Sequence, residues 1–282
     1  MRREVDGRPI GIPDGALAYD ERVTALSRTV SVEPVARRAY GDHPSQRLEI
    51  FAPTDAPAPK LPVVMFLHGG AWMNGGLHWL RFMAPAVLAV PALFVAVTYR
   101  LAPGHRWPAQ YEDARDALRH VRHAVGEHGG DAARIVIGGH SAGGQLASMV
   151  TLRGEAGPLA GCMPVSSPFD LRYGDVDEAS SQARVYKYLL AQRADDADAS
   201  PILFVSGNTT PFHLSWGGRD MPHIIRAGVA MRESLQAQPG EVTSQVYADD
   251  DHFSTHTRLA DPADDWYARL RALLESPPVK TQ

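Results

Sequence analysis

The sequence lacks several features that would set it apart from ordinary globular proteins. It has a single cysteine, Cys162, so it cannot form an internal disulfide, and the apolar run around this residue predicts a buried strand. It has no run of about 18 apolar residues that could cross a membrane. No apolar segment of the secretory type follows the basic residues near its start, so we expect a cytoplasmic protein with no membrane partner.

Concentrated charge of one sign is also absent. The chain carries 28 Lys and Arg against 32 Asp and Glu, a net charge of -4, and no segment gathers the basic residues into a stripe. Binding to a phosphate backbone needs such a stripe, so nucleic acid is not an expected partner. Hydrophobic residues make up 44% and charged residues 21% of the 282 positions, which indicates a single globular domain over residues 1–282.

What the sequence does contain is an alternation of strand and helix patterns. Alternating or continuous apolar runs predict strands at 47–51, 62–67, 92–98, 134–137, 161–166, 211–216 and 242–247. Helical patterns are found at 108–128, 144–152, 222–238 and 262–274. The alternation predicts an α/β fold with a doubly wound, mostly parallel sheet that has helices on both faces.

Two segments lie outside this alternation. Residues 1–45 are mixed and polar, with a short helix expected near 20–27, and we interpret them as an N-terminal arm packed across the domain. Residues 169–208 are too long for a plain crossover connection, and we interpret them as a small cap insertion. The cap would cover the carboxyl edge of the sheet, where ligands bind in folds of this class.

The pentapeptide Gly139-His140-Ser141-Ala142-Gly143 matches the nucleophile-elbow pattern G-x-S-x-G. A strand is predicted before it and a helix after it, which is the context that the pattern requires. Small residues are needed at 139 and 143 because the serine sits at a sharp turn with strained backbone angles. Glycine-rich turns after strands are common, so the pentapeptide alone does not establish a catalytic serine.

A serine hydroxyl needs a base to take its proton and a third group to orient that base. Asp220 follows the strand predicted at 211–216, and His252 follows the strand predicted at 242–247. The order Ser141, Asp220, His252 is the chain order expected with this elbow. The sequence therefore predicts a catalytic triad made of these three residues.

Other interpretations of the same residues stay open at this point. Asp220 could be the N-cap of the helix that begins near 222, with or without a catalytic role. His256, four residues after His252, competes with it for the role of base. The two histidines also have metal-ligand spacing, but no Glu follows the first as in H-E-x-x-H and no third ligand is evident, so we expect no metal.

Acyl transfer also needs hydrogen-bond donors for the oxyanion that develops on the substrate. The segment His68-Gly69-Gly70-Ala71-Trp72 directly follows the strand predicted at 62–67, where this kind of fold places its first oxyanion loop. Glycines there let the backbone approach the substrate oxygen closely, and the N–H of Ala142 would be the second donor. A flexible glycine turn is the alternative interpretation.

Together these motifs resemble the esterase branch of the α/β-hydrolases, which includes hormone-sensitive-lipase-like carboxylesterases and arylformamidases (kynurenine formamidases). The resemblance spans about residues 40–256, and Tyr99-Arg100-Leu101-Ala102-Pro103 followed by Trp107-Pro108-Ala109 is similar to a segment shared across the branch. It implies an eight-stranded α/β-hydrolase sheet with a small cap. It also implies a triad of Ser141, Asp220 and His252, with oxyanion donors at Gly69, Gly70 and Ala142.

Two departures from the pattern bear on the choice within the branch. Lipase-like esterases usually carry a third glycine after H-G-G and an acidic residue before the serine, whereas this chain has Ala71 and His140. These departures favour the arylformamidase-like side. The motifs describe the acyl-transfer chemistry and do not identify a substrate.

We therefore expect a serine hydrolase that cleaves a carboxylic ester through an acyl-enzyme intermediate, with an aryl formamide of the N-formylkynurenine type as the alternative substrate. A non-catalytic ligand receptor on the same fold is a rival, although all three triad positions are filled. No cofactor is expected, and the partners are a small ester or amide substrate and a second copy of the chain in a homodimer. Pocket walls or ordinary packing residues are expected at Trp72, His140, Phe169, Tyr186 and Tyr188.

Overall fold

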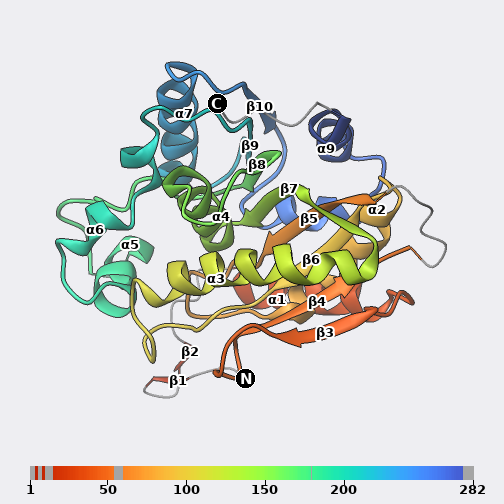
Figure 1. Ribbon diagram of the computed structural model, residues 1–282. Helices are drawn as coiled ribbons and strands as arrows, with labels where there is room; N and C mark the ends of the chain where they lie inside the picture. Colours follow the sequence, from red (N-terminus) through yellow and green to blue (C-terminus); the bar gives the residue numbers. More distant parts are fainter. Residues whose placement is uncertain (1–3, 6–7, 10–14, 54–59, 179, 276–282) are drawn as a thin grey trace.

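The computed structural model describes residues 4–5, 8–9, 15–53, 60–178 and 180–275 (Figure 1). Its centre is an eight-stranded sheet with the strand order β10-β9-β8-β7-β5-β6-β4-β3. The strands from β10 to β6 in this order are parallel, whereas β4 and β3 are antiparallel additions at one end. The predicted doubly wound, mostly parallel α/β sheet is confirmed.

The strands and helices alternate along the chain. The strands are β1 (Glu4–Val5), β2 (Arg8–Pro9), β3 (Ala36–Ala39), β4 (Arg47–Phe51), β5 (Leu61–Leu67), β6 (Leu93–Val97), β7 (Gly130–His140), β8 (Gly161–Val165), β9 (Phe212–Gly217) and β10 (Val242–Tyr247). The helices are α1 (Ala16–Arg28), α2 (Ala84–Leu88), α3 (Ala109–Ala124), α4 (Ala142–Arg153), α5 (Ser181–Arg184), α6 (Asp195–Asp198), α7 (Pro222–Gln236), α8 (Ser254–Thr257) and α9 (Asp265–Glu275). A π-helix covers Val185–Leu189, and short 3₁₀ segments cover Leu77–Trp79, Arg81–Met83, Val125–His128, Pro201–Phe204 and Arg258–Ala260.

The sheet is buried on both faces, as continuous apolar runs require. Side chains alternate along β5, so that Val63, Met65 and Leu67 belong to the core beneath α3, α4 and α7. Val64 and Phe66 belong to the opposite core, beneath α1, α2 and α9. The period of two therefore divides one apolar strand between two hydrophobic layers.

Strand β3 is the part of the sheet that apolar patterning does not reveal. Its sequence is Ala36-Arg37-Arg38-Ala39, and only Ala36 is buried. It pairs antiparallel with β4 at the edge of the sheet. Edge strands tolerate charged side chains because one side faces solvent, so the hydrophobic period is lost there.

The two segments outside the alternation take up positions beside the carboxyl edge of the sheet. Within the predicted arm, α1 includes the helix expected near 20–27, and Tyr19 and Val23 are buried against the core. The segment predicted as a cap contains α5, the π-helix and α6 (Figure 1). Parts of the predicted arm and cap, residues 1–3, 6–7, 10–14 and 179, lie outside the described residues. The boundaries of the arm and of the cap stay predictions.

Candidate active site

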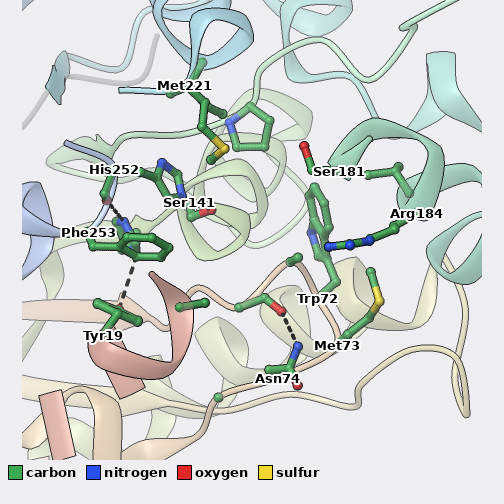
Figure 2. Close-up of a pocket in the computed structure, with 18 of the residues that line it drawn as sticks. Tyr19, Trp72, Met73, Asn74, Ser141, Ser181, Arg184, Met221, His252 and Phe253 are labelled. Carbon is green, nitrogen blue, oxygen red and sulfur yellow. Dashed lines mark hydrogen bonds between the residues drawn. The ribbon is translucent and has the colours of Figure 1, made fainter. Parts of the chain in front are cut away.

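Ser141 occupies a sharp turn between β7 and α4. Its backbone angles, φ 53° and ψ -119°, are strained for a non-glycine residue. The turn requires glycine at 143, because a Cβ there would lie 2.2 Å from the carbonyl oxygen of Leu67 on the neighbouring strand. The strained turn places the Ser141 side chain at the end of β7, where it lines a pocket (Figure 2).

The structure brings the three predicted triad residues together. His252 Nε2 lies 3.0 Å from Ser141 Oγ, and His252 Nδ1 lies 2.8 Å from Asp220 Oδ1. Asp220 and His252 follow β9 and β10, whose carboxyl ends lie at the same edge of the parallel sheet as the end of β7. With Nδ1 donating to the carboxylate, Nε2 is left to accept the serine proton.

Asp220 is buried and held as an anion. Burial by itself would raise its pKa, but the hydrogen bond and positive charge of His252, the Ser166 hydroxyl and the Met221 backbone N–H together hold that pKa below its usual value. The Met221 N–H donates to Asp220 Oδ1 over 2.7 Å. Met221, rather than Asp220, is the residue that precedes the first turn of α7. Asp220 therefore contacts the imidazole of His252 and is not the N-cap residue of α7.

His256 is placed away from Ser141, in the core behind the elbow. It is fully buried, its ring stacks on His140 with centroids 4.8 Å apart, and Tyr19 Oη lies 2.7 Å from its Nδ1. Burial, followed by the positive charge that His140, His68 and His252 would carry, lowers its pKa well below the usual value. The structure thus brings His252, and not its competitor, to the nucleophile.

His140 lies between the elbow and the loop that carries the base. Its Nε2 donates to the backbone carbonyl of His252 over 2.8 Å, which ties the two chain segments together. Burial lowers the pKa of His140 to about 3, so the ring is neutral and can carry this single N–H. The residue that departs from the lipase-like pattern therefore supports the position of His252.

The loop after β5 is fixed beside Ser141. Gly69 packs so closely that a Cβ on it would lie 3.2 Å from Ser141 Cβ. His68, at the start of the loop, makes two contacts that fix it in place. Tyr99 Oη donates to the His68 carbonyl over 2.9 Å, and His68 Nε2 lies 3.0 Å from Thr98 Oγ1. Burial lowers the pKa of His68 to about 4, so this histidine is neutral.

Of the predicted oxyanion donors, Gly70 lines the pocket that holds Ser141, and Gly69 and Ala142 lie next to Ser141. Within the described residues, no acceptor takes a hydrogen bond from the backbone N–H of Gly69, Gly70 or Ala142. Gly70 has φ 106°, a conformation that L side chains rarely adopt, and a Cβ there would collide with the carbonyl of Asn74. All three N–H groups thus lie near Ser141 and have no acceptor among the described residues.

The pocket in front of Ser141 includes two of the five predicted wall residues. Trp72 and His140 line it, and Trp72 Nε1 donates to Gln145 Oε1 over 3.0 Å, which fixes the indole. Phe169, Tyr186 and Tyr188 are not among the residues that line the pocket, so the expectation for these three is corrected. Phe169 is buried in the core, Tyr186 turns its hydroxyl to Asp196, and Tyr188 lies against Lys187.

Several wall residues were not anticipated from the sequence. Tyr19 from α1 and Phe253 beside the base form one side of the pocket, and Met73, Ser181 and Arg184 lie on the other (Figure 2). Ring centroids of Tyr19 and Phe253 are 5.0 Å apart. The position of Phe253 next to His252 could have indicated it from the sequence, whereas the contribution of α1 depends on how the arm packs.

The residues that the structure describes lack two further features. In that part of the chain, no helix is both long and apolar enough to cross a membrane. The same residues contain no group of three or more His, Cys, Asp and Glu side chains arranged to hold a metal ion.

The chain is similar to known hydrolases in sequence. A model of the alpha/beta hydrolase fold family matches residues 64–256. Esterase LipC of Mycobacterium tuberculosis (strain ATCC 25618 / H37Rv) is 31% identical over 220 residues, which cover 71% of this chain and 55% of that protein. Carboxylesterase NlhH of Mycobacterium tuberculosis (strain CDC 1551 / Oshkosh) is 44% identical over 92 residues, 32% of this chain and 29% of that protein. The matched region thus spans about half, or less, of these curated relatives.

Solved structures agree on the fold. A Pyrobaculum calidifontis esterase has a TM-score of 0.76 at 19% identity, with 95% of each chain covered. EstE1, a thermophilic carboxylesterase cloned from a metagenomic library, has a TM-score of 0.74 at 21% identity, with 92% of this chain and 96% of that chain covered. At these identities the likeness establishes the architecture.

Proposed function

Because the chain belongs to the α/β-hydrolase family, we propose that it is a serine carboxylesterase with Ser141 as nucleophile, His252 as base and Asp220 as the residue that orients the base. The observation that carries the proposal is a pair of consecutive contacts. Ser141 Oγ lies 3.0 Å from His252 Nε2, and His252 Nδ1 lies 2.8 Å from Oδ1 of the buried Asp220 carboxylate. The names of the similar proteins, an esterase and a carboxylesterase, support the choice of ester over other acyl substrates.

The geometry supports a two-step acyl transfer. Ser141 Oγ attacks the ester carbonyl carbon as His252 Nε2 takes the serine proton, and the carbonyl oxygen becomes an oxyanion held by the N–H groups of Gly69, Gly70 and Ala142. His252 then gives the proton to the departing alkoxide, so that an alcohol leaves and an acyl-enzyme remains. Water, deprotonated by His252, repeats the attack and releases the acid and free Ser141.

The test combines turnover with covalent labelling. We expect hydrolysis of p-nitrophenyl butyrate by the purified protein and a loss of about 10⁴-fold or more in kcat for Ser141→Ala, as for removal of a triad nucleophile. A fluorophosphonate probe should modify Ser141 in the wild type, located by peptide mass spectrometry. Labelling at another residue, or full turnover by the folded Ser141→Ala variant, would refute the assignment.

Cleavage of an aryl formamide is the second candidate. The observation that favours it is His140 at the position before the nucleophile, where lipase-like esterases usually carry an acidic residue. The ratio of kcat/KM for N-formylkynurenine to that for phenyl acetate decides between the two substrates. A ratio above one would make the formamide the preferred substrate.

The homodimer and the cytoplasmic location stay predictions. Light scattering coupled to size-exclusion chromatography would measure the mass of the assembly in solution, and cell fractionation would locate the protein.

A further inference from the structure

Arg184 brings a positive charge to the pocket that holds Ser141. It is the last residue of α5, it is half-buried, and it lines the same pocket as Ser141, His252 and Trp72. Figure 2 shows its guanidinium reaching from α5 toward Trp72 and the interior of the pocket, on the side away from Tyr19 and Phe253. The side chain therefore points at the space that a substrate occupies.

The position of Arg184 is set by the ends of its short helix. Ser180 Oγ accepts a hydrogen bond from the Ala183 N–H over 3.1 Å and so caps the first turn of α5. Val185, the next residue, is buried in the core and anchors the other end. Between these two fixed points the side chain at 184 is held on the pocket side of the cap.

Arg184 differs from the other arginines of the cap in that none of the described residues is an acidic partner to it. Arg172 pairs with Asp170 at 2.7 Å, and Arg193 lies 3.5 Å from Asp175. Among the residues that the structure describes, no carboxylate lies within ion-pair distance of Arg184 and no carbonyl accepts from it. A half-buried guanidinium without a partner has lost part of its hydration and gains most from an anion that enters the pocket.

The remaining pocket wall does not supply that anion. Asp20 is the acidic residue of the lining, and its Oδ1 already accepts from Trp79 Nε1 over 2.8 Å and lies 3.9 Å from His78 Nε2. Burial lowers the pKa of His223, another lining residue, to about 4, so this ring adds no charge. Much of the rest of the wall is apolar, with Met73, Tyr173 and Met221 among its members.

We propose that Arg184 binds a carboxylate of the substrate, so that the enzyme prefers esters whose acyl or alcohol part carries an acidic group. This inference rests on the proposed esterase function. A carboxylate fits better than a phosphate, because its single charge is balanced by one guanidinium and its two oxygens match the planar fork. A phosphate dianion carries a second negative charge that one guanidinium does not balance.

The test uses three esters that differ in the presence and place of a carboxylate. p-Nitrophenyl butyrate is neutral, mono-p-nitrophenyl glutarate carries the carboxylate on the acyl part, and 4-(butyryloxy)benzoate carries it on the leaving group. We expect wild-type kcat/KM to be higher for one of the acidic esters than for the neutral one, and that ester shows which side Arg184 serves.

Substitution at 184 should then change selectivity. We expect Arg184→Gln to lower the ratio of kcat/KM for the preferred acidic ester to that for the neutral ester by about 10- to 100-fold, the range for a hydrogen bond to a charged group. Arg184→Lys should retain part of the preference. Arg271→Gln is the matched control, because it removes a partly exposed arginine from α9, far from α5 (Figure 1), and should leave the ratio unchanged.

Three outcomes would overturn the proposal in distinguishable ways. If the wild type hydrolyses the neutral ester but favours neither acidic one, the carboxylate preference is wrong and the esterase function stands. If Arg184→Gln lowers all three rates by one factor, Arg184 supports the cap and does not bind substrate charge. If the wild type hydrolyses none of the esters, the esterase function itself fails, and this inference fails with it.

Discussion

The carboxyl edge of the sheet and the cap both face the pocket, but they are held in different ways. At the edge, backbone packs against backbone, as where Gly143 meets the Leu67 carbonyl and Gly69 meets the His140 carbonyl. The cap, in contrast, is made of short helices that contact the domain through side chains, such as Trp107 Nε1 to Asp198 Oδ2 at 2.8 Å, in addition to the main-chain hydrogen bond from the Trp107 N–H to the Leu189 carbonyl over 2.9 Å. A rigid edge suits groups that must hold catalytic geometry, whereas a side-chain-anchored cap suits groups that select a substrate.

A link joins the two regions. Gln145 on α4 accepts from Trp72 Nε1 in the oxyanion loop, and its own Nε2 donates to the Ala199 carbonyl in the cap over 2.7 Å. A buried glutamine thus connects the cap to the edge of the sheet that carries Ser141. The comparison predicts that changes at the edge alter kcat or folding, and that changes in the cap mainly alter KM.

The largest expected effect separates His252, at the edge, from His256, in the core behind the elbow. His252→Gln should lower kcat for p-nitrophenyl butyrate by about 10⁴-fold or more, because the general base is lost. His256→Gln, the matched variant, should keep kcat per folded molecule within about tenfold, since His256 does not reach Ser141 and acts through packing. Steady-state kinetics with the folded fraction measured by circular dichroism gives both values. The assignment of the base fails if the second variant is the inactive one.

Glycines of the two regions should differ next in their effect on stability. Gly143→Ala places a Cβ 2.2 Å from the Leu67 carbonyl oxygen, so we expect the free energy of unfolding to fall by about 3 kcal/mol. Gly174→Ala in the cap meets nothing within 4 Å and only strains a backbone with φ 67°, which costs about 1 kcal/mol. Urea denaturation measures both. Equal losses would contradict the difference in packing between edge and cap.

The buried histidines behind the edge should make stability depend on pH. The pKa of His256 in the folded protein is well below 6.5, so below that pH the unfolded chain binds a proton that the folded chain does not. The free energy of unfolding therefore decreases as the pH falls below about 6.5, by up to about 1.4 kcal/mol per pH unit for this one residue. His256→Gln should reduce the slope measured between pH 6.5 and 5 by up to that amount. An unchanged slope would show that His256 titrates alike in both states.

The smallest expected effect is in the cap. Trp107→Phe removes the hydrogen bond to Asp198 but keeps an aromatic ring in a buried position, so we expect a loss of about 1 kcal/mol in the attachment of the cap. KM for p-nitrophenyl butyrate should rise up to about fivefold while kcat stays within about twofold. A fall in kcat with KM unchanged would mean that the cap shapes the catalytic geometry directly.

Much of the fold and the triad could be predicted because both depend on local patterns. Continuous apolar runs give strands buried on two faces, and the groups that follow such strands meet at one edge of a parallel sheet. Ser141, Asp220 and His252 each follow a strand, and the structure brings them within hydrogen-bond distance. Strand β3 was not located because its exposed arginines hide the alternation.

The pocket wall was predicted less well, because burial depends on how distant segments pack. Aromatic residues of the cap looked suitable, yet Phe169 turns into the core and the Tyr186 hydroxyl turns to Asp196. Tyr19 reaches the pocket from a helix more than a hundred residues before the elbow in the chain. Nothing in the local sequence of either segment says which side chains face the substrate.

By itself, the sequence determined the α/β architecture and predicted which residues meet at the site, since hydrophobic period and strand-end motifs are local properties of the chain. Only the tertiary structure decided between His252 and His256, because the two are four residues apart and differ in what packs around them. It also decided that Arg184 faces the pocket with no acidic partner among the described residues, since the direction of a cap side chain is set by its contacts and not by its neighbours in sequence.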